Sequence, residues 1–163
     1  MTIPIETWWL PRPSKSKYPG SFPLHFESKL FQLYPVFPYS RILQPFGGMA
    51  LYGKRCDINP DTDPDYCCDA HNLPFPNNSE FDFVLLDPPY SDDYAAQLYR
   101  TGKLHKKKYV SEAVRVCKPG GYIAHYDIVL NPRPEGTGFD RIIVVLTRMY
   151  HKPRICCIYK KDR

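Results

Sequence analysis

The run FDFVLLDPPYS, residues 81 to 91, is the part of the sequence that decides the fold. Its aromatic and branched apolar residues predict a strand that is buried on both faces, and the strand ends at an acid, two prolines and a tyrosine. Successive prolines fix the backbone that follows, so the carbonyl of the first proline is held stiffly. We therefore expect Asp87, Pro88, Pro89 and Tyr90 to form a rigid group at the carboxyl end of a central strand.

Strand-like and helix-like segments alternate on both sides of this run. Strand patterns bounded by turn residues occur at 41–46, 54–59, 81–89, 122–130, 141–150 and 154–160. Helical apolar spacing occurs at 24–34 and at 109–117, where KPGG (118–121) is expected to end the second helix, and residues 131–140 are expected to be a loop. This order predicts an α/β fold with a mainly parallel sheet, helices on both faces and a C-terminal antiparallel hairpin.

Length and composition restrict the class of protein. A chain of 163 residues suits one domain, 1–163, and its 15% aromatic content excludes general disorder. No apolar stretch approaches the roughly 20 residues of a membrane span, and the first residues lack a signal-peptide pattern. We expect a soluble, cytoplasmic protein with no membrane partner, in which residues 1–16 are an N-terminal extension. Trp8 and Trp9 either stack on substrate or anchor this extension, and we favour anchoring.

Charge and cysteine content point to possible partners. Both flanks of the chain are basic, whereas the stretch from Cys56 to Tyr99 contains acids but neither Lys nor Arg. Basic flanks indicate either a surface that attracts a polyanion such as nucleic acid or simple solubility. The six cysteines include no CxxC pair, so we interpret them as reduced, small apolar residues and expect no metal.

Four successive strand ends share a ligand-binding character. They carry Gly47 with Gly48, then Asp57, Asp69 and Asp87. In an open α/β sheet, ligands bind outside the carboxyl ends of the strands, and glycines let backbone amides approach them. An acid at the second strand end can accept hydrogen bonds from ribose hydroxyls, and one at the next can accept from the amine of adenine.

The ordered segments PFGG, CDINP, CCDAHNLPF, FDFVLLDPPY and EAVRVCKPGGYI resemble the Rossmann-like, class I S-adenosylmethionine (SAM)-dependent methyltransferases. The DPPY tetrapeptide is similar to that of the amino-methyltransferase branch, which acts on nucleic acid bases, and above all to the DNA N6-adenine enzymes. The resemblance covers residues 17–160, the expected catalytic fold. It includes KYPGSFPLHF (17–26), which is similar to the segment that closes over the methionine part of the cofactor.

The resemblance implies a role for each matching residue, with SAM as the cofactor. The implied cofactor-binding residues are Phe46, Gly47, Gly48, Asp57, Ile58, Asp69, Ala70 and Asp87. The implied catalytic residues are Asp87, Pro88, Pro89 and Tyr90. The Asp87 carboxylate and the Pro88 carbonyl would each accept one N–H of the target amine, which directs its lone pair toward the methyl group, while Tyr90 would stack on the flipped base.

The sequence departs from the family pattern at three places. Gln44 stands where the family usually has an acid, so the contact to the methionine amine is weakened, and Ala50 replaces a glycine. Only Met49 to Lys54 separates the glycine turn from the next strand, which is too short for the usual helix. We therefore expect the dipole of that helix to be missing from the site.

Basic residues interleaved with tyrosines indicate contact with nucleic acid, or else a solvated helix start. The candidate residues are Tyr94, Arg100, Lys103, Lys106, Lys107 and Lys108. No insertion is large enough to read several base pairs, so selectivity is expected to be low or to come from a partner or a second subunit.

We expect methylation of adenine N6 in DNA. The alternatives are an RNA base amine, a small-molecule substrate, or a non-catalytic nucleic-acid-binding protein on a degenerate methyltransferase fold.

Overall fold

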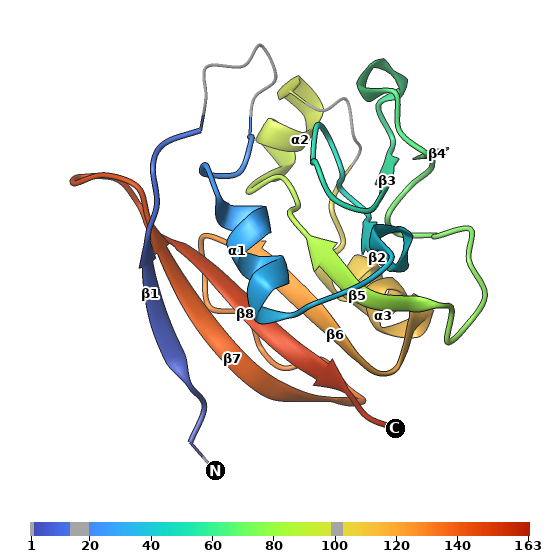
Figure 1. Ribbon diagram of the computed structural model, residues 1–163. Coiled ribbons are helices and arrows are strands. Elements are labelled where there is room, and N and C mark those ends of the chain that lie inside the picture. The colour runs from blue at the N-terminus through green and yellow to red at the C-terminus, as the bar shows by residue number, and fades with distance from the viewer. Residues whose placement is uncertain (1, 14–19, 99–102) are drawn as a thin grey trace.

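The computed structural model describes residues 2–13, 20–98 and 103–163. They form an eight-stranded sheet in the order β1-β7-β8-β6-β5-β2-β3-β4 (Figure 1). The strands are β1 (Ile5–Trp9), β2 (Ile42–Gln44), β3 (Lys54–Asp57), β4 (Tyr66–Cys67), β5 (Phe81–Leu86), β6 (Cys117–Asp127), β7 (Thr137–Leu146) and β8 (Arg154–Lys161). The helices are α1 (Phe26–Leu33), α2 (Asp92–Leu98) and α3 (Lys106–Val116), with 3-10 turns at Tyr39–Arg41 and Pro60–Thr62.

The sheet is parallel except around its last strand. β8 runs antiparallel to β6 and β7, whereas the other neighbouring strands are parallel. The predicted parallel sheet with a C-terminal antiparallel hairpin is therefore confirmed. The chain proceeds from β2 outward to β3 and β4, and then from β5 outward to β6 on the other side. The topological switch point, where α/β sheets bind ligands, lies between β2 and β5.

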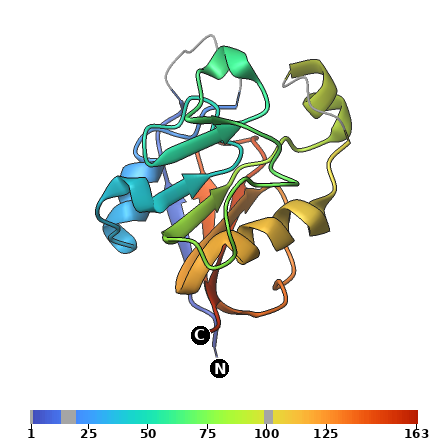
Figure 2. The ribbon, with the colours of Figure 1, turned by 90° about the vertical axis from the view of Figure 1, so that its right-hand side faces the viewer.

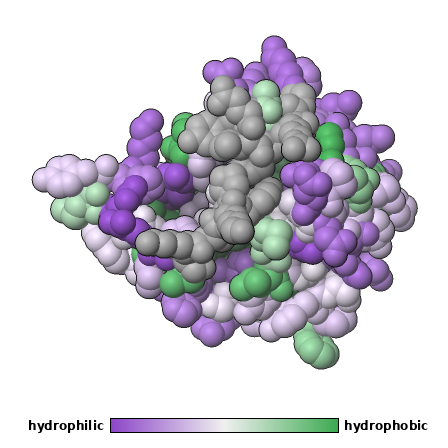
Figure 3. Space-filling model, turned by 90° about the horizontal axis from the view of Figure 1, so that it is seen from above, coloured by the Kyte–Doolittle hydropathy of each residue, from purple (hydrophilic) through white to green (hydrophobic). Residues whose placement is uncertain are grey.

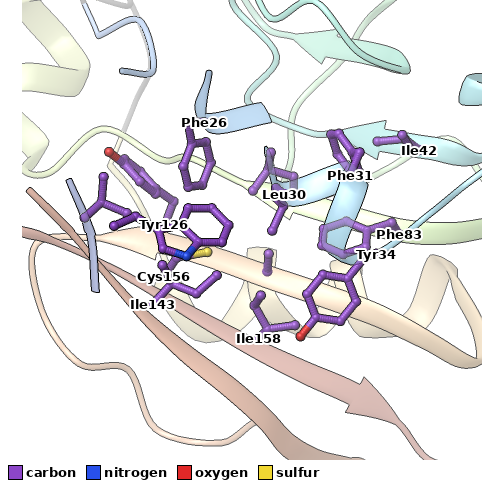
Figure 4. Packing of buried hydrophobic residues seen from close by; sticks show 14 of the residues in the cluster. Phe26, Leu30, Phe31, Tyr34, Ile42, Phe83, Tyr126, Ile143, Cys156 and Ile158 are labelled. Carbon is purple, nitrogen blue, oxygen red and sulfur yellow. The ribbon is translucent and has the colours of Figure 1, made fainter. Parts of the chain in front are cut away.

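Helices cover both faces of the sheet, as predicted, with α1 on one face and α3 on the other (Figures 1 and 2). β5 contributes to both layers, because Phe83 and Leu85 belong to the α1 cluster and Val84 and Leu86 to the α3 cluster. Figure 4 shows the α1 cluster, in which Leu30 points toward the sheet. Each such fully buried side chain stabilises the fold by about 1.5–3 kcal/mol.

The N-terminal segment differs from the predicted extension, because Ile5–Trp9 form a strand of the sheet. β1 pairs parallel with β7, with Ile5 opposite Ile142 and Trp9 opposite Leu146. Trp8 is 3% exposed and packs against Phe26, so its predicted anchoring role is confirmed, whereas Trp9 is 60% exposed. The pairing joins segments far apart in the sequence, and a five-residue pattern cannot reveal it.

The predicted boundaries around β6 and β7 need two corrections. KPGG does not lie between helix and strand, because β6 begins at Cys117 and the pairing with β5 shifts between Phe81 and Phe83. Gly121 permits this irregularity, since an added Cβ would lie 2.7 Å from the sulfur of Cys117. The predicted loop 131–140 ends early, because β7 already begins at Thr137. The pairing of Gly138 with Lys160 on β8 overrides the weak strand propensity of glycine.

Two further sequence expectations concern membranes and thiols. Within the described parts of the chain, no helix is both long and apolar enough to cross a membrane. The cysteines carry free thiols, and four of them are buried: Cys56, Cys117, Cys156 and Cys157. These four act as small apolar core residues, as their sequence context suggested.

Candidate active site

A cavity of about 900 Å³ lies across the carboxyl ends of the central strands. Hydrophilic side chains are prominent on this side of the molecule (Figure 3). All residues predicted to bind cofactor line this cavity: Phe46, Gly47, Gly48, Asp57, Ile58, Asp69, Ala70 and Asp87. Pro88, Pro89, Tyr90 and Lys103 line it as well. The fold therefore brings these separate sequence segments into one site.

Asp57, at the end of β3, fixes the glycine turn that follows β2. One carboxylate oxygen accepts a hydrogen bond from the amide of Gly48 at 2.8 Å, and the other accepts from the amide of Asn59 at 2.9 Å. Each oxygen keeps a second lone pair that can accept from a ligand hydroxyl. Hydrogen bonds to a charged acceptor contribute about 1.5–3 kcal/mol each, so Asp57 organises the turn strongly.

Arg55 supports the glycine turn from the side opposite Asp57. No helix follows this turn, as the short linker to the next strand predicted. Residues 45–53 contain turns and bends. The guanidinium of Arg55 donates to the carbonyls of Gly48 at 2.7 Å and Thr62 at 3.0 Å. A Cβ on Gly47 would lie 2.7 Å from the Cβ of Arg55, so this position requires glycine. Side-chain hydrogen bonds thus replace the missing helix as the support of the turn.

Glu27 places a buried carboxylate in the cavity wall, which sequence reasoning missed. It comes from α1, and the amide of Gln44 donates to it at 2.7 Å while the backbone amide of Leu51 donates at 3.1 Å. Burial raises the pKa of Glu27 despite these hydrogen bonds. The acid absent at position 44 is therefore present one side chain away. The available signal was one acid within the amphipathic pattern of residues 24–34, next to the segment expected to close over the cofactor.

Asp69 is held by His71 at the other end of the cavity. The amide of His71 donates to Asp69 at 2.8 Å, and the ring Nδ1 lies 2.6 Å from the same oxygen. The Nε2 of His71 accepts from the backbone amide of His105, the residue before α3, so Nδ1 carries the ring proton. Partial burial of Asp69 opposes ionisation, but the His71 hydrogen bonds and the charge of Lys108 lower its pKa overall.

Asp87 and Tyr90 lie at the end of β5, as predicted. No hydrogen bond within the described residues reaches the Asp87 carboxylate, and burial raises its pKa well above the usual range, although the charge of Arg154 opposes the rise. Arg154 also contacts Tyr90, because its Nε donates to the phenol oxygen at 2.9 Å and its guanidinium lies 4.7 Å from the ring centroid. Arg154 was not foreseen, since only tertiary structure brings β8 beside this loop.

The residues predicted to contact nucleic acid lie in different environments. Lys103 lines the cavity, while Lys107 and Lys108 are exposed at the start of α3. Lys106 instead donates to buried Asp127 at 2.8 Å and to Asn131 at 3.0 Å, so it is engaged within the fold. Arg100 lies outside the described residues, and so does the side chain of Tyr94.

Comparison with known proteins identifies the fold. No family model matches the chain, and no curated protein sequence matches it. Among solved structures, it is similar to TrmN from Thermus thermophilus, with a TM-score of 0.62 and 19% identity over 88% of this chain and 50% of that one. It is also similar to YhhF from Escherichia coli, with a TM-score of 0.58 and 14% identity over 94% of this chain and 91% of that one.

A third similar structure is a SAM-dependent methyltransferase from Aquifex aeolicus, with a TM-score of 0.54 and 16% identity over 83% of this chain and 89% of that one. At these identities the likeness concerns the fold. The chain therefore has the class I methyltransferase fold, and it spans half the length of TrmN.

Proposed function

We propose that this protein is a SAM-dependent methyltransferase that acts on an exocyclic amine of a nucleic acid base, with adenine N6 in DNA as its target. The observation that carries the proposal is the shared cavity. The acids at the ends of β3 and β5 line the same space as the glycine turn after β2, at the switch point of the sheet.

The residues of the cavity fit the parts of SAM. Asp57 has acceptor capacity for the ribose hydroxyls, and the backbone of Gly47 and Gly48 lines the cavity beside it. Asp69, oriented by His71, supplies an acceptor for the adenine amine. Glu27 supplies a carboxylate for the positively charged amine of the methionine part, the role for which Gln44 is unsuited. When bound, SAM supplies an electrophilic methyl group.

Asp87, Pro88 and Tyr90 suit the target amine. An ionised Asp87 and the Pro88 carbonyl each accept one N–H, which leaves the nitrogen lone pair free for attack. Tyr90 offers a ring for stacking on the base, and Arg154 fixes the orientation of that ring from strand β8. Burial raises the pKa of Asp87 and so favours its protonated form, whereas a bound cationic ligand such as SAM would favour ionisation, because an opposite charge favours the charged form of a carboxyl.

Calorimetric titration with SAM and with S-adenosylhomocysteine tests the first part of the proposal. We expect saturable binding of both ligands at micromolar concentration. Transfer of radiolabelled methyl groups to single-stranded DNA and to RNA of the same sequence then tests the substrate, with mass spectrometry of the digested nucleosides to identify N6-methyladenine. Absence of cofactor binding by the folded protein would favour the non-catalytic alternative, and methylation of RNA alone would replace DNA as substrate.

A further inference from the structure

The turn between β7 and β8 is basic, exposed and projecting. In Figure 1 this turn, in orange-red, extends past the edge of the sheet. Arg148, His151 and Lys152 are exposed, and Tyr150 is 109% exposed, the largest value among the exposed large hydrophobic residues. Tyr150 also has a backbone φ of 55°, which residues other than glycine seldom adopt. A fully exposed aromatic side chain in a strained turn indicates a function other than packing.

Positive charges gather around this turn. Desolvation lowers the pKa of His151, and the positive charges of Arg148, Arg154 and Arg12 lower it further, so all three arginines act on this imidazole. No carboxylate within the described residues forms an ion pair with the side chains of Arg12, Arg148 or Lys152. The hairpin-tip surface comprises Arg12, Arg148, Tyr150, His151, Lys152 and Arg154. Its positive charge is therefore available to an external anion.

The hairpin-tip surface continues into the candidate active site. His151, Lys152 and Arg154 line the cavity themselves. Arg154 forms the junction, because its guanidinium donates to Tyr90 on one side and to the backbone carbonyl of Lys152 on the other. A strand whose target base stacks on Tyr90 would thus pass directly over the turn.

We propose that the hairpin-tip surface binds the single-stranded DNA that flanks the methylated base, an inference that rests on the proposed function. Arg148, Lys152 and Arg12 contact phosphates, and Tyr150 stacks on a neighbouring unpaired base. Cationic side chains around an exposed ring suit such a strand, since phosphates supply charge and each unpaired base supplies a face. The surface also supplies a substrate contact that a large recognition insertion would otherwise provide.

Fluorescence anisotropy with a labelled single-stranded DNA of about 12 nucleotides tests this surface. The double variant Arg148→Ala with Lys152→Ala is compared with Lys160→Ala with Arg163→Ala, which removes the same charges from exposed positions at the other end of β8. We expect the first variant to bind about tenfold more weakly at low salt. The slope of log K against log salt should decrease by about 1.4, since two phosphate contacts are lost. The second variant should resemble the wild type.

Tyr150 provides a test that does not depend on charge. Tyr150→Ala should weaken DNA binding about tenfold with an unchanged salt slope, while Tyr150→Phe should retain the affinity because the ring remains. Affinity for SAM, measured by calorimetry, should be unchanged in both Tyr150 variants, because Tyr150 does not line the cavity.

Three results would overturn the inference in distinguishable ways. Equal affinities for both double variants would show that DNA binds elsewhere and would leave the proposed activity intact. Tighter binding of RNA of the same sequence, weakened by the same variants, would replace DNA as the partner. Cofactor binding by a wild type that binds neither nucleic acid would refute both this surface and the proposed substrate.

Discussion

Replacing Asp87 by Asn should abolish methyl transfer and at the same time stabilise the protein at neutral pH. Asp87 is partly buried in the cavity wall, its carboxylate accepts no hydrogen bond from the described residues, and desolvation raises the pKa of the group well above its usual range. The folded state therefore holds the proton of this carboxyl up to a higher pH than the unfolded chain does. Asn has nearly the same shape but cannot ionise, so the variant avoids this penalty.

The magnitude follows from linkage. Each unit by which the folded-state pKa exceeds the unfolded value reduces the free energy of unfolding by about 1.4 kcal/mol above both pKa values. The reduction develops as pH rises from the ordinary carboxyl range through the raised pKa, and it is absent at lower pH. For a protein of this size, each kcal/mol corresponds to about 2–4 °C in Tm. Loss of a positioned acceptor should decrease kcat by about 10²–10⁴-fold.

Thermal unfolding of wild type and Asp87→Asn between pH 5 and 8.5, together with single-turnover methyl transfer, measures both effects. The Tm of the variant should exceed that of the wild type by an amount that increases with pH. Asp57→Asn serves as the comparison, because Asp57 is hydrogen-bonded and should lose stability instead. A variant Tm below that of the wild type at pH 8, or wild-type turnover, would refute the reasoning.

Three further predictions concern the support of the site. Gly47→Ala should lower the free energy of unfolding by about 1–3 kcal/mol in urea, because its Cβ would overlap Arg55, whereas Gly138→Ala, with open space around the added Cβ, should have little effect. Glu27→Gln should weaken calorimetric binding of SAM and S-adenosylhomocysteine about tenfold, because both carry the methionine amine; equal affinities would remove Glu27 from the site. Lys106→Met should lower the free energy of unfolding at pH 7, because hydrogen bonds from Lys106 and Asn131 outweigh burial and lower the pKa of Asp127. The loss should become smaller as pH falls through the carboxyl range, and an unchanged urea midpoint at pH 7 would contradict this prediction.

Local residue patterns were sufficient for the parts of the fold that depend on local chemistry. The apolar run before Asp87 identified the central strand. The short linker from Met49 to Lys54 correctly predicted that no helix lies between β2 and β3. The series of acids and glycines at strand ends was informative because parallel strands present their carboxyl ends at one edge of a sheet. The sequence by itself thus determined the mainly parallel α/β fold and the presence of the strand-end acids and glycines in the cavity.

Tertiary structure decided the contacts between segments that are distant in the sequence. Strand β1 exists because Ile5–Trp9 pair with β7, and Arg154 reaches Tyr90 because β8 lies beside β6. The carboxylate of Glu27 enters the cavity because α1 packs over β2, and Lys106 turns toward Asp127. Such contacts depend on which segments the completed sheet brings together. The periodicity of a single segment records only which of its faces is apolar, so it contains no information about them.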